Sequence, residues 1–503
     1  MTADRRFRPS GSRITPAARQ RTRAAAGGIG LIAAVVLCAG QGTITSPAGA
    51  ASVGHGTYRA AATLSGPITT GKVIEPVSAL APSLAASGYV EQEFFASGTA
   101  TAFKATTQPS DGKWSIEPTT RAFYRTRILV RRPSDPSRFN GTLVVEWMNV
   151  SEGESAPEWD YLNPELMRDG YAYVAVSAQA QGVDGGRPLL GSLTAPSSPG
   201  LVGSEPTRYG TLHDPGDQYA LDMFAQIGAA LRAPRGPVLG HLHPTHIVAV
   251  GESQSAFYLT TFADTVQPLT HTFDGIFIHS RGGGAAPLNS SLAADQGPQD
   301  VRIRTDLSVP VFMFETQTDV IELGYASARQ PDTRRIRTWE VAGTAHADSY
   351  IVGPFAAALG CINPVNDGPQ HVVVEAAFSD FNKWVDDGTP PPAPAPFRLT
   401  SSKPVALALD RHGNVIGGVR TPAVDVPVST LSGAAPAGTS VVCSLFGSAR
   451  PFSPSTLTSL YHDPRRYRSS YEASLDMAVK GGFILKADRA ALLAPAQLVQ
   501  FPS

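Results

Sequence analysis

Short apolar runs alternate with helical patterns between residues 88 and 290, and this alternation limits the fold more than any other feature of the chain. Strands separated by crossover helices form a mostly parallel sheet with helices on both faces. The first strands are joined by short turns instead, so we expect the sheet to begin antiparallel. The runs that we expect to be strands are residues 89–95, 125–131, 142–147, 172–177, 246–250, 275–279, 311–314 and 338–341. The sequence thus predicts an α/β fold with a single sheet of about eight strands.

Apolar residues recur at intervals of three and four in three segments, which predicts helices at residues 219–231, 255–265 and 377–385. Two long segments rich in Gly, Pro and Ser, residues 182–217 and 281–306, are expected to be loops inserted in the sheet. Both follow the carboxyl ends of strands, which is the edge at which open α/β sheets bind ligands. We therefore expect the functional site at that edge.

A proline run at residues 390–396 separates the predicted sheet from a C-terminal extension, residues 397–503. In the extension the sequence predicts a hairpin at residues 405–419 and a helix that begins after Asp463 and ends before Gly481. The extension has too few strands for a core of its own. We therefore expect it to pack on the sheet.

The first fifty residues differ from the rest of the chain. They hold seven arginines, and an apolar run at residues 30–40 precedes the small residues that end at Ala50. The run is too short to cross a bilayer of about 30 Å, and this order of features is typical of a secretory signal. We expect cleavage near Ala50 and secretion of residues 51–503 as one catalytic domain. A retained membrane-anchoring helix is the alternative.

The remainder of the chain is mildly acidic, because the first fifty residues hold seven of the 41 Lys and Arg residues and one of the 42 Asp and Glu residues. A mildly acidic chain has no electrostatic footprint for nucleic acid or an anionic membrane, so we expect neither as a partner. We also expect no membrane span after residue 50, because no later run is long and apolar enough.

Two cysteines follow the predicted cleavage site, Cys361 and Cys443. In an oxidising compartment this pair predicts a disulfide that closes a loop of about 80 residues. Two buried free thiols are the alternative. Neither cysteine lies in a CxxC pattern, and we interpret His241, His243 and His246 as part of a capping loop. The sequence therefore predicts no metal site.

A candidate nucleophile lies in the segment Gly-Glu-Ser-Gln-Ser at residues 251–255, between a predicted strand and a predicted helix. A nucleophile elbow requires this strand-turn-helix context, with the serine hydroxyl exposed above the sheet and small neighbours on each side. Ser253 occupies the turn and Gly251 supplies one small neighbour. Ser255 stands where the motif usually has a second glycine, so an ordinary turn is the alternative.

A catalytic serine needs a histidine base that is oriented by a carboxylate. In folds with this elbow the chain order is Ser, acid, His. His346 follows the last predicted strand in a loop of small residues and is the preferred base. Asp319, four residues beyond a strand end, is the preferred acid. Glu315 is the alternative acid, and Asp348 is a third candidate that could instead cap a helix.

Hydrolysis through an acyl-enzyme also needs two backbone N–H groups that stabilise the oxyanion. We expect the first from Gln254, the residue after the nucleophile. The second is expected from the loop after residues 142–147, with Met148 or Asn149 as the candidates.

The chain resembles the secreted alpha/beta hydrolase domain proteins of bacteria, which are assigned as serine esterases. The segments that carry the resemblance are residues 146–151, 170–179, 251–255, 317–320, 340–348 and 417–422. The resemblance implies the alpha/beta hydrolase fold and supports Ser253, Asp319 and His346 as the triad. It implies no particular substrate, because this fold hosts many hydrolases.

Together these observations predict a secreted carboxylic ester hydrolase that acts on a small-molecule or lipid-like ester without a cofactor. An amidase or peptidase and a secreted acyltransferase use the same triad and remain alternatives, as does a non-catalytic binding protein. An epoxide hydrolase or dehalogenase would require an aspartate at position 253, so both are excluded.

Overall fold

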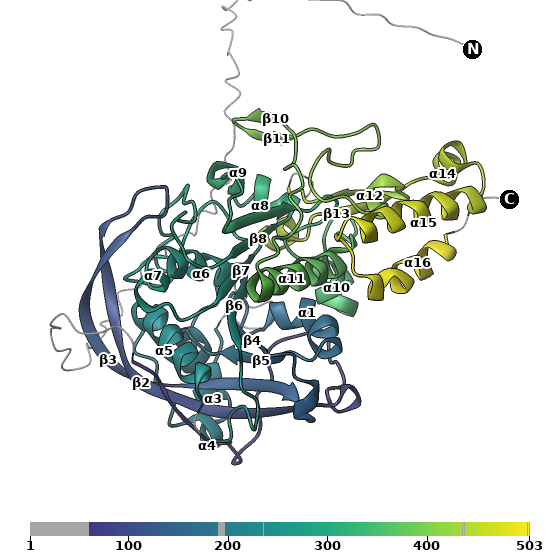
Figure 1. The fold of residues 1–503 in the computed structure, drawn as a ribbon. Coiled ribbons are helices and arrows are strands. Elements are labelled where there is room, and N and C mark those ends of the chain that lie inside the picture. The colour runs from purple at the N-terminus through teal and green to yellow at the C-terminus, as the bar shows by residue number, and fades with distance from the viewer. Residues whose placement is uncertain are drawn as a thin grey trace, which may run out of the picture. The chain divides into compact units, whose positions relative to one another are not determined.

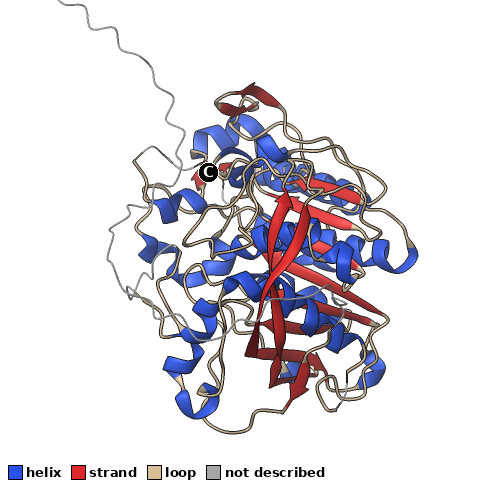
Figure 2. Ribbon diagram, turned by 90° about the vertical axis from the view of Figure 1, so that its left-hand side faces the viewer, coloured by secondary structure: helices blue, strands red, loops and turns tan. Residues whose placement is uncertain are grey.

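A nine-stranded sheet with helices on both faces forms the centre of the structure (Figures 1 and 2). This computed structural model describes residues 60–189, 197–234, 236–434, 436, 438–499 and 501. The secretory signal expected within residues 1–50 lies outside these residues. In spatial order the strands are β1-β2-β3-β5-β4-β6-β7-β8-β9. Their bounds are Thr63–Ser65 (β1), Tyr89–Thr107 (β2), Ser115–Pro133 (β3), Thr142–Trp147 (β4), Ala172–Val176 (β5), His246–Glu252 (β6), Gly275–His279 (β7), Val311–Glu315 (β8) and Ile336–Glu340 (β9).

The sheet has an antiparallel and a parallel part. Pairing is antiparallel from β1 through β2 and β3 to β5, and parallel from β5 through β4, β6, β7 and β8 to β9. The predicted fold class is confirmed, because the structure has a mostly parallel sheet that begins antiparallel.

Two hydrophobic clusters cover the two faces of the sheet. Because side chains alternate along a strand, Leu143 and Val145 of β4 face one cluster and Val144 faces the other. Helices α5 and α6 contribute Phe224 and Phe262 to the first cluster, whereas α1 and α11 build the second. The four helices span Pro157–Arg168 (α1), Ala220–Arg232 (α5), Gln254–Asp264 (α6) and Gln370–Asp387 (α11).

The hairpin of β2 and β3 is much longer than predicted. Each strand has 19 residues, and their pairing runs from Tyr89 opposite Pro133 to Thr107 opposite Ser115. The added part is rich in Thr and Ala and lacks the branched apolar run that marks a strand in a sequence. It is stable as a strand because Ala100, Ala102 and Phe103 are buried in the same cluster as α5.

The two predicted loop insertions differ from each other. Among the described residues, 281–306 contains no helix or strand, as expected. The segment 182–217 instead contains short helices, so its prediction as a plain loop is wrong in part. Short helices between β5 and β9 span Ala180–Asp184 (α2), Gly200–Ser204 (α3), Pro206–Tyr209 (α4), Gln267–Thr270 (α7), Gln317–Ile321 (α8) and Tyr325–Ala328 (α9).

The C-terminal extension contains the predicted helix and a shortened form of the predicted hairpin. Helix α15 begins at Pro464, where the Asp463 side chain accepts hydrogen bonds from two backbone N–H groups, and it ends before Gly481. Of the hairpin expected at residues 405–419, the part around the turn is present, with an antiparallel bridge between Leu409 and Val415 and backbone hydrogen bonds from Ile416 to Ala408 and from Asp410 to Asn414. The first predicted strand is shortened because residues 405–407 pair with the strand before them. The elements from β9 onward span Ser349–Val352 (α10), Leu399–Ser402 (β10), Val405–Leu407 (β11), Pro422–Asp425 (α12), Ser429–Ser432 (β12), Val441–Leu445 (α13), Ser448–Pro451 (β13), Pro454–Tyr461 (α14), Pro464–Lys480 (α15) and Arg489–Gln497 (α16).

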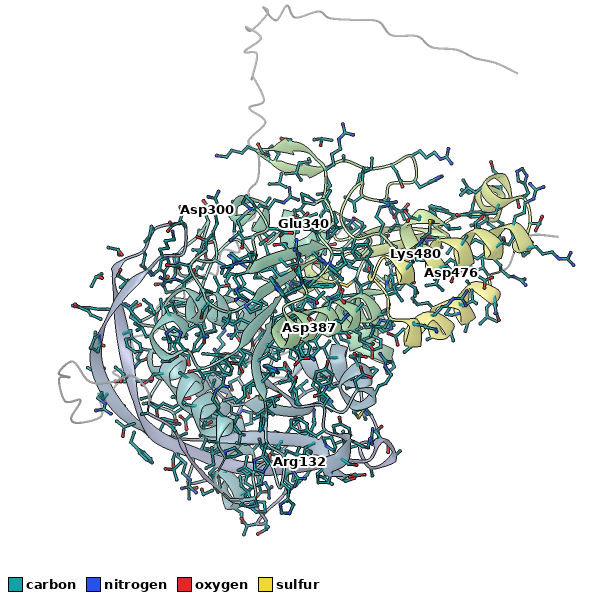
Figure 3. All side chains as sticks on the ribbon, viewed as in Figure 1. Arg132, Asp300, Glu340, Asp387, Asp476 and Lys480 are labelled. Carbon is teal, nitrogen blue, oxygen red and sulfur yellow. A yellow bond between two sulfur atoms is a disulfide. The ribbon has the colours of Figure 1, made fainter. Side chains whose placement is uncertain are left out.

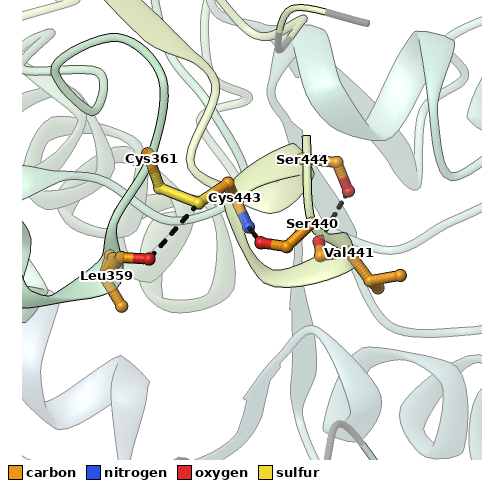
Figure 4. Close-up of a disulfide and its surroundings, with 6 residues drawn as sticks. All are labelled: Leu359, Cys361, Ser440, Val441, Cys443 and Ser444. Carbon is orange, nitrogen blue, oxygen red and sulfur yellow. Dashed lines mark hydrogen bonds between the residues drawn. A yellow bond between two sulfur atoms is a disulfide. The ribbon is translucent and has the colours of Figure 1, made fainter. Parts of the chain in front are cut away.

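The extension is attached at the β9 edge of the sheet. The carboxylate of Glu340 (labelled in Figure 3) accepts a hydrogen bond from Phe397 N at 2.7 Å and is paired with Arg329. The backbone of Val419 bonds to Glu340 O and to Ala342 N, so the extension continues the sheet beyond β9. A disulfide between Cys361 and Cys443 adds a covalent link (Figure 4).

Candidate active site

The candidate nucleophile lies on a sharp corner between a strand and a helix. Ser253 follows β6 and precedes α6, and its backbone has φ 58° and ψ −119°, a conformation that L-residues rarely adopt. Close packing at the corner requires small residues. A Cβ on Gly251 would lie 3.0 Å from both the Ser255 Cβ and the Leu259 side chain. The predicted elbow context is therefore present, with Ser255 fully buried in place of the second glycine.

The three predicted triad residues meet at the carboxyl edge of the sheet. Ser253 Oγ lies 2.7 Å from His346 Nε2, and His346 Nδ1 lies 2.7 Å from Asp319 Oδ1. Ser253 follows β6, Asp319 lies in the helix after β8, and His346 lies in the loop after β9. The segments that follow three different strands thus bring a hydroxyl, an imidazole and a carboxylate together in a series of two hydrogen-bond contacts.

Asp319 is held in place by its own helix. It lies in the first turn of α8, where its other oxygen, Oδ2, accepts hydrogen bonds from Thr316 N at 2.6 Å and Thr316 Oγ1 at 2.7 Å. Burial alone would raise the pKa of Asp319, but the charge and hydrogen bond of His346, with those of Thr316, hold it below its ordinary value. The side chain is therefore an oriented, ionised acceptor for His346 Nδ1–H.

Burial and the neighbouring carboxylates shift the pKa of His346 in opposite directions. Burial disfavours the imidazolium and lowers the pKa, but the hydrogen bond and charge of Asp319 and the charge of Glu252 raise it above the ordinary value. The environment thus favours a histidine that can accept a proton from Ser253.

The other two acids considered from the sequence are placed differently. Glu315 ends β8, is fully buried, and its carboxyl oxygens have no hydrogen-bond partner among the described residues. Asp348 caps α10 by accepting from Tyr350 N and Ile351 N. The carboxylate that accepts the hydrogen bond from His346 Nδ1–H is that of Asp319.

Two predicted oxyanion donors are already paired. Met148 N–H donates to Val176 O at 3.2 Å, and Asn149 N–H donates to Ser155 O at 3.0 Å. These bonds fold the loop after β4 back on its neighbours, so neither N–H is free for a substrate. For one of them to be the second donor, as the sequence predicts, one of these backbone bonds would have to break.

Val150 has the backbone N–H in this loop that is directed at the elbow. It donates to the Gln254 side-chain oxygen at 2.9 Å, while Asn149 Nδ2 donates to Glu252 O at 3.2 Å. The backbone N–H of Gln254, the first in α6, has no partner within the helix. The Val150 N–H would become available to another acceptor only if the Gln254 carboxamide moved away.

Sequence reasoning missed two contributors to the site. Thr316 holds Asp319, and the spacing of threonine and aspartate three residues apart is a recognisable capping pattern. Glu252 lies beside His346 and was passed over because the motif treats its position as variable. Among the described residues no group of three or more His, Cys, Asp or Glu side chains could hold a metal ion.

A serine on a strand-to-helix corner, at the carboxyl edge of a sheet with this strand order, defines the class of alpha/beta hydrolases. A family model described as "Alpha/beta hydrolase domain" matches residues 64–494. The chain belongs to this alpha/beta hydrolase domain family, which confirms the resemblance seen in the sequence.

Solved structures with similar chains include several hydrolases. A glucuronoyl esterase from Solibacter usitatus is 10% identical, with 58% of this chain and 84% of that chain covered and a TM-score of 0.27. XC6422 from Xanthomonas campestris, described as a member of a/b serine hydrolase without lid, is 13% identical over 49% and 86%, with a TM-score of 0.26. The carboxylesterase Cest-2923 from Lactobacillus plantarum WCFS1 is 14% identical over 45% and 76%, with a TM-score of 0.24. Similarities this distant say nothing about the substrate of this chain. No curated protein matches it.

Within the part of the chain that the structure describes, no helix combines the length and the hydrophobicity needed to cross a bilayer.

Proposed function

We propose that this protein is a secreted serine hydrolase of carboxylic esters, with Ser253, His346 and Asp319 as its triad. The observation that carries the proposal is the line of two 2.7 Å contacts from Ser253 Oγ through the His346 imidazole to Asp319. A hydroxyl at its free pKa is a poor nucleophile, and this arrangement is the one that activates it.

In the acylation step Ser253 Oγ attacks the ester carbonyl carbon while its proton moves to His346 Nε2. Asp319 accepts the Nδ1–H hydrogen bond, which fixes the tautomer and stabilises the imidazolium. The tetrahedral intermediate collapses as its carbon–oxygen bond to the alcohol breaks. The leaving alcohol oxygen takes the proton from Nε2, and the acyl group stays on Ser253.

Deacylation repeats these transfers with water. His346 accepts a proton from the water as the water oxygen attacks the acyl carbon. The bond to Oγ then breaks, and the proton returns to Ser253. The carboxylic acid leaves and the enzyme is restored without a cofactor.

The proposed oxyanion site consists of the backbone N–H groups of Gln254 and Val150. Gln254 begins α6, where a backbone N–H has no partner within the helix, and the N–H of Val150 becomes available once the Gln254 side chain turns away. Such donors stabilise charge that develops on the substrate oxygen in the transition state.

The replacement Ser253→Ala tests the proposal. We expect a loss of about 10⁵-fold or more in kcat on p-nitrophenyl esters, with an unchanged melting temperature, because triad members act as a unit. Reaction with an alkyl fluorophosphonate should occur in the wild type and be absent in the variant. A folded Ser253→Ala protein that still turned over ester would rule the mechanism out.

The same assay separates the alternatives. Hydrolysis of an anilide at a rate similar to the matching ester would indicate an amidase or peptidase. Transfer of the acyl group to an added alcohol in preference to water would indicate an acyltransferase. A wild-type protein that neither hydrolyses esters nor reacts with the fluorophosphonate would indicate a binding protein.

A further inference from the structure

Glu252 places a second carboxylate beside the proposed catalytic histidine. It is the last residue of β6 and directly precedes Ser253. Its side chain is 6% exposed, and its Oε1 lies 3.6 Å from His346 Nε2. This is the nitrogen that contacts Ser253 Oγ at 2.7 Å, so the imidazole has a carboxylate near each of its two nitrogens.

The contact is electrostatic and not a hydrogen bond. At 3.6 Å, Glu252 Oε1 is beyond the usual N–H···O range, so it leaves the Nε2 lone pair to Ser253. Among the described residues, no side chain or backbone group donates a hydrogen bond to the Glu252 carboxylate. A buried carboxylate without such donors is unfavourable unless a positive charge lies nearby.

Titratable groups on β7, α1 and α8 also face Glu252. On β7, burial lowers the pKa of His279 to about 4. On α1, burial raises the pKa of Glu158 well above its ordinary value, which favours the neutral carboxyl. Burial also raises the pKa of Tyr161, so its phenol stays neutral. Asp319, on α8, already pairs with His346. The protonated His346 imidazole is therefore the positive charge with which the Glu252 carboxylate can pair.

We propose that Glu252 is a positioning residue of the reaction, and that its carboxylate stabilises the His346 imidazolium from the Nε2 side as Asp319 does from the Nδ1 side. The inference rests on the proposed function. When Ser253 gives its proton to Nε2, the new positive charge forms next to Oε1. In a site from which water is largely excluded, this charge pair is worth much more than in bulk water.

The proposal predicts a coupled titration near neutral pH. Burial raises the pKa of Glu252 to about 7, against the lowering effect of the His346 charge. When two ionisable groups interact strongly, each apparent pKa is a property of the pair and not of one residue. Glu252 and His346 should therefore together determine the acid limb of the kcat/KM profile, which reports on the free enzyme.

The replacement Glu252→Gln removes the charge and keeps the shape. Without the carboxylate the imidazolium is less stable, so the pKa of His346 falls. We expect the acid limb of kcat/KM to move to lower pH by about one unit. The plateau at pH 8 to 9 should fall about tenfold, because a weaker base removes the Ser253 proton less readily.

Glu158→Gln is the matched control. It replaces a neighbouring, fully buried carboxyl, whose raised pKa favours the neutral form, with a neutral amide, and the histidine that Glu158 faces is His279 at 3.4 Å. The acid limb of the kcat/KM profile of Glu158→Gln should coincide with that of the wild type. A merely structural role of Glu252 would lower the plateau and leave the acid limb in place, which would overturn the proposal.

Fluorophosphonate titration separates this inference from the proposed function. If the wild type neither turns over ester nor is labelled at Ser253, the proposed function fails. If wild type and Glu252→Gln are both labelled one to one and their acid limbs coincide, only the role of Glu252 fails. Should Glu252→Gln not fold, Glu252→Ala removes the same charge and carries the same test.

Discussion

At the end of β8 two acidic side chains lie four residues apart, and their surroundings differ. Asp319 receives hydrogen bonds from Thr316 and His346, and these hold its pKa below the ordinary value. Burial and the charge of Asp319 raise the pKa of Glu315 well above its ordinary value, which favours a neutral carboxyl. The ionised side chain is the one that contacts the histidine.

The replacement Asp319→Asn tests this difference. An amide in place of the carboxylate favours the wrong imidazole tautomer, so kcat on an ester should fall by about 10⁴-fold while the fold is retained. The control is Glu315→Gln, which should change kcat far less because a neutral carboxyl is replaced by a neutral amide. If Glu315→Gln were the more damaging change, the two roles would be reversed.

Much of the candidate site could be inferred from the sequence, because each triad residue follows the end of an apolar strand. The structure brings Ser253, Asp319 and His346 together, and their catalytic role stays a proposal. The second oxyanion donor could not be inferred, because the pairing of Met148 and Asn149 depends on how their loop folds back. No sequence pattern encodes that pairing.

Among the elements, the buried parallel strands were the most predictable. Strands β4, β6, β7 and β8 are buried along nearly their whole length, and each appears as a mainly apolar run. Strand β9 is buried too, but only Ile336 and Trp339 of its five residues are apolar. The outer half of the β2–β3 hairpin and the pairing at residues 399–407 depend on contacts with distant segments. Short-range patterns therefore did not predict them.

A buried ion-pair network joins the β2–β3 hairpin to the loop that leads from β4 to α1. Arg127 of β3 is 1% exposed and pairs with Glu93 of β2 at 2.8 Å and with Glu154. Arg208 of α4 pairs with the same Glu93. The network thus connects the insertion after β5, the hairpin and the loop beside Val150.

The replacement Arg127→Met should destabilise the protein by about 3–5 kcal/mol. It removes the cation that pairs with the largely buried Glu154 carboxylate, and it leaves Glu93 with Arg208 alone. Urea denaturation measures the change. The control on the same hairpin is Lys104→Met, which breaks the exposed pair of Lys104 and Glu117 and should cost less than about 1 kcal/mol. Equal losses in the two variants would contradict the assignment of the network as a stabilising element.

For the whole molecule, the disulfide and the sheet edge hold the C-terminal extension in different ways. Cys443 lies in α13, and the last residue of α13, Leu445, accepts a hydrogen bond at 3.1 Å from the backbone of Ala347. Ala347 directly follows His346. The covalent link therefore lies close to the loop that carries the proposed base.

Replacing both Cys361 and Cys443 with serine should lower the free energy of unfolding by about 4 kcal/mol in the loop-closure model. The bond closes a loop with a sequence separation of 82 residues, so the unfolded chain gains much freedom when it is absent. Denaturation of both proteins with and without a reductant measures the loss. Native wild-type protein in which both thiols alkylate freely would show that the extension is held by packing alone.

The positions of the two cysteines also affect what a protease could do to this protein. The proline run at residues 390–396 lies between them in the chain, and Pro392 O accepts a hydrogen bond from the Trp339 indole at 2.8 Å. A single backbone cut in the run would leave two fragments that migrate as one species until the disulfide is reduced. The nicked protein would keep all three triad residues on the larger fragment. The disulfide would also keep the extension attached. Cleavage in the proline run would therefore break the backbone without releasing any part of the protein.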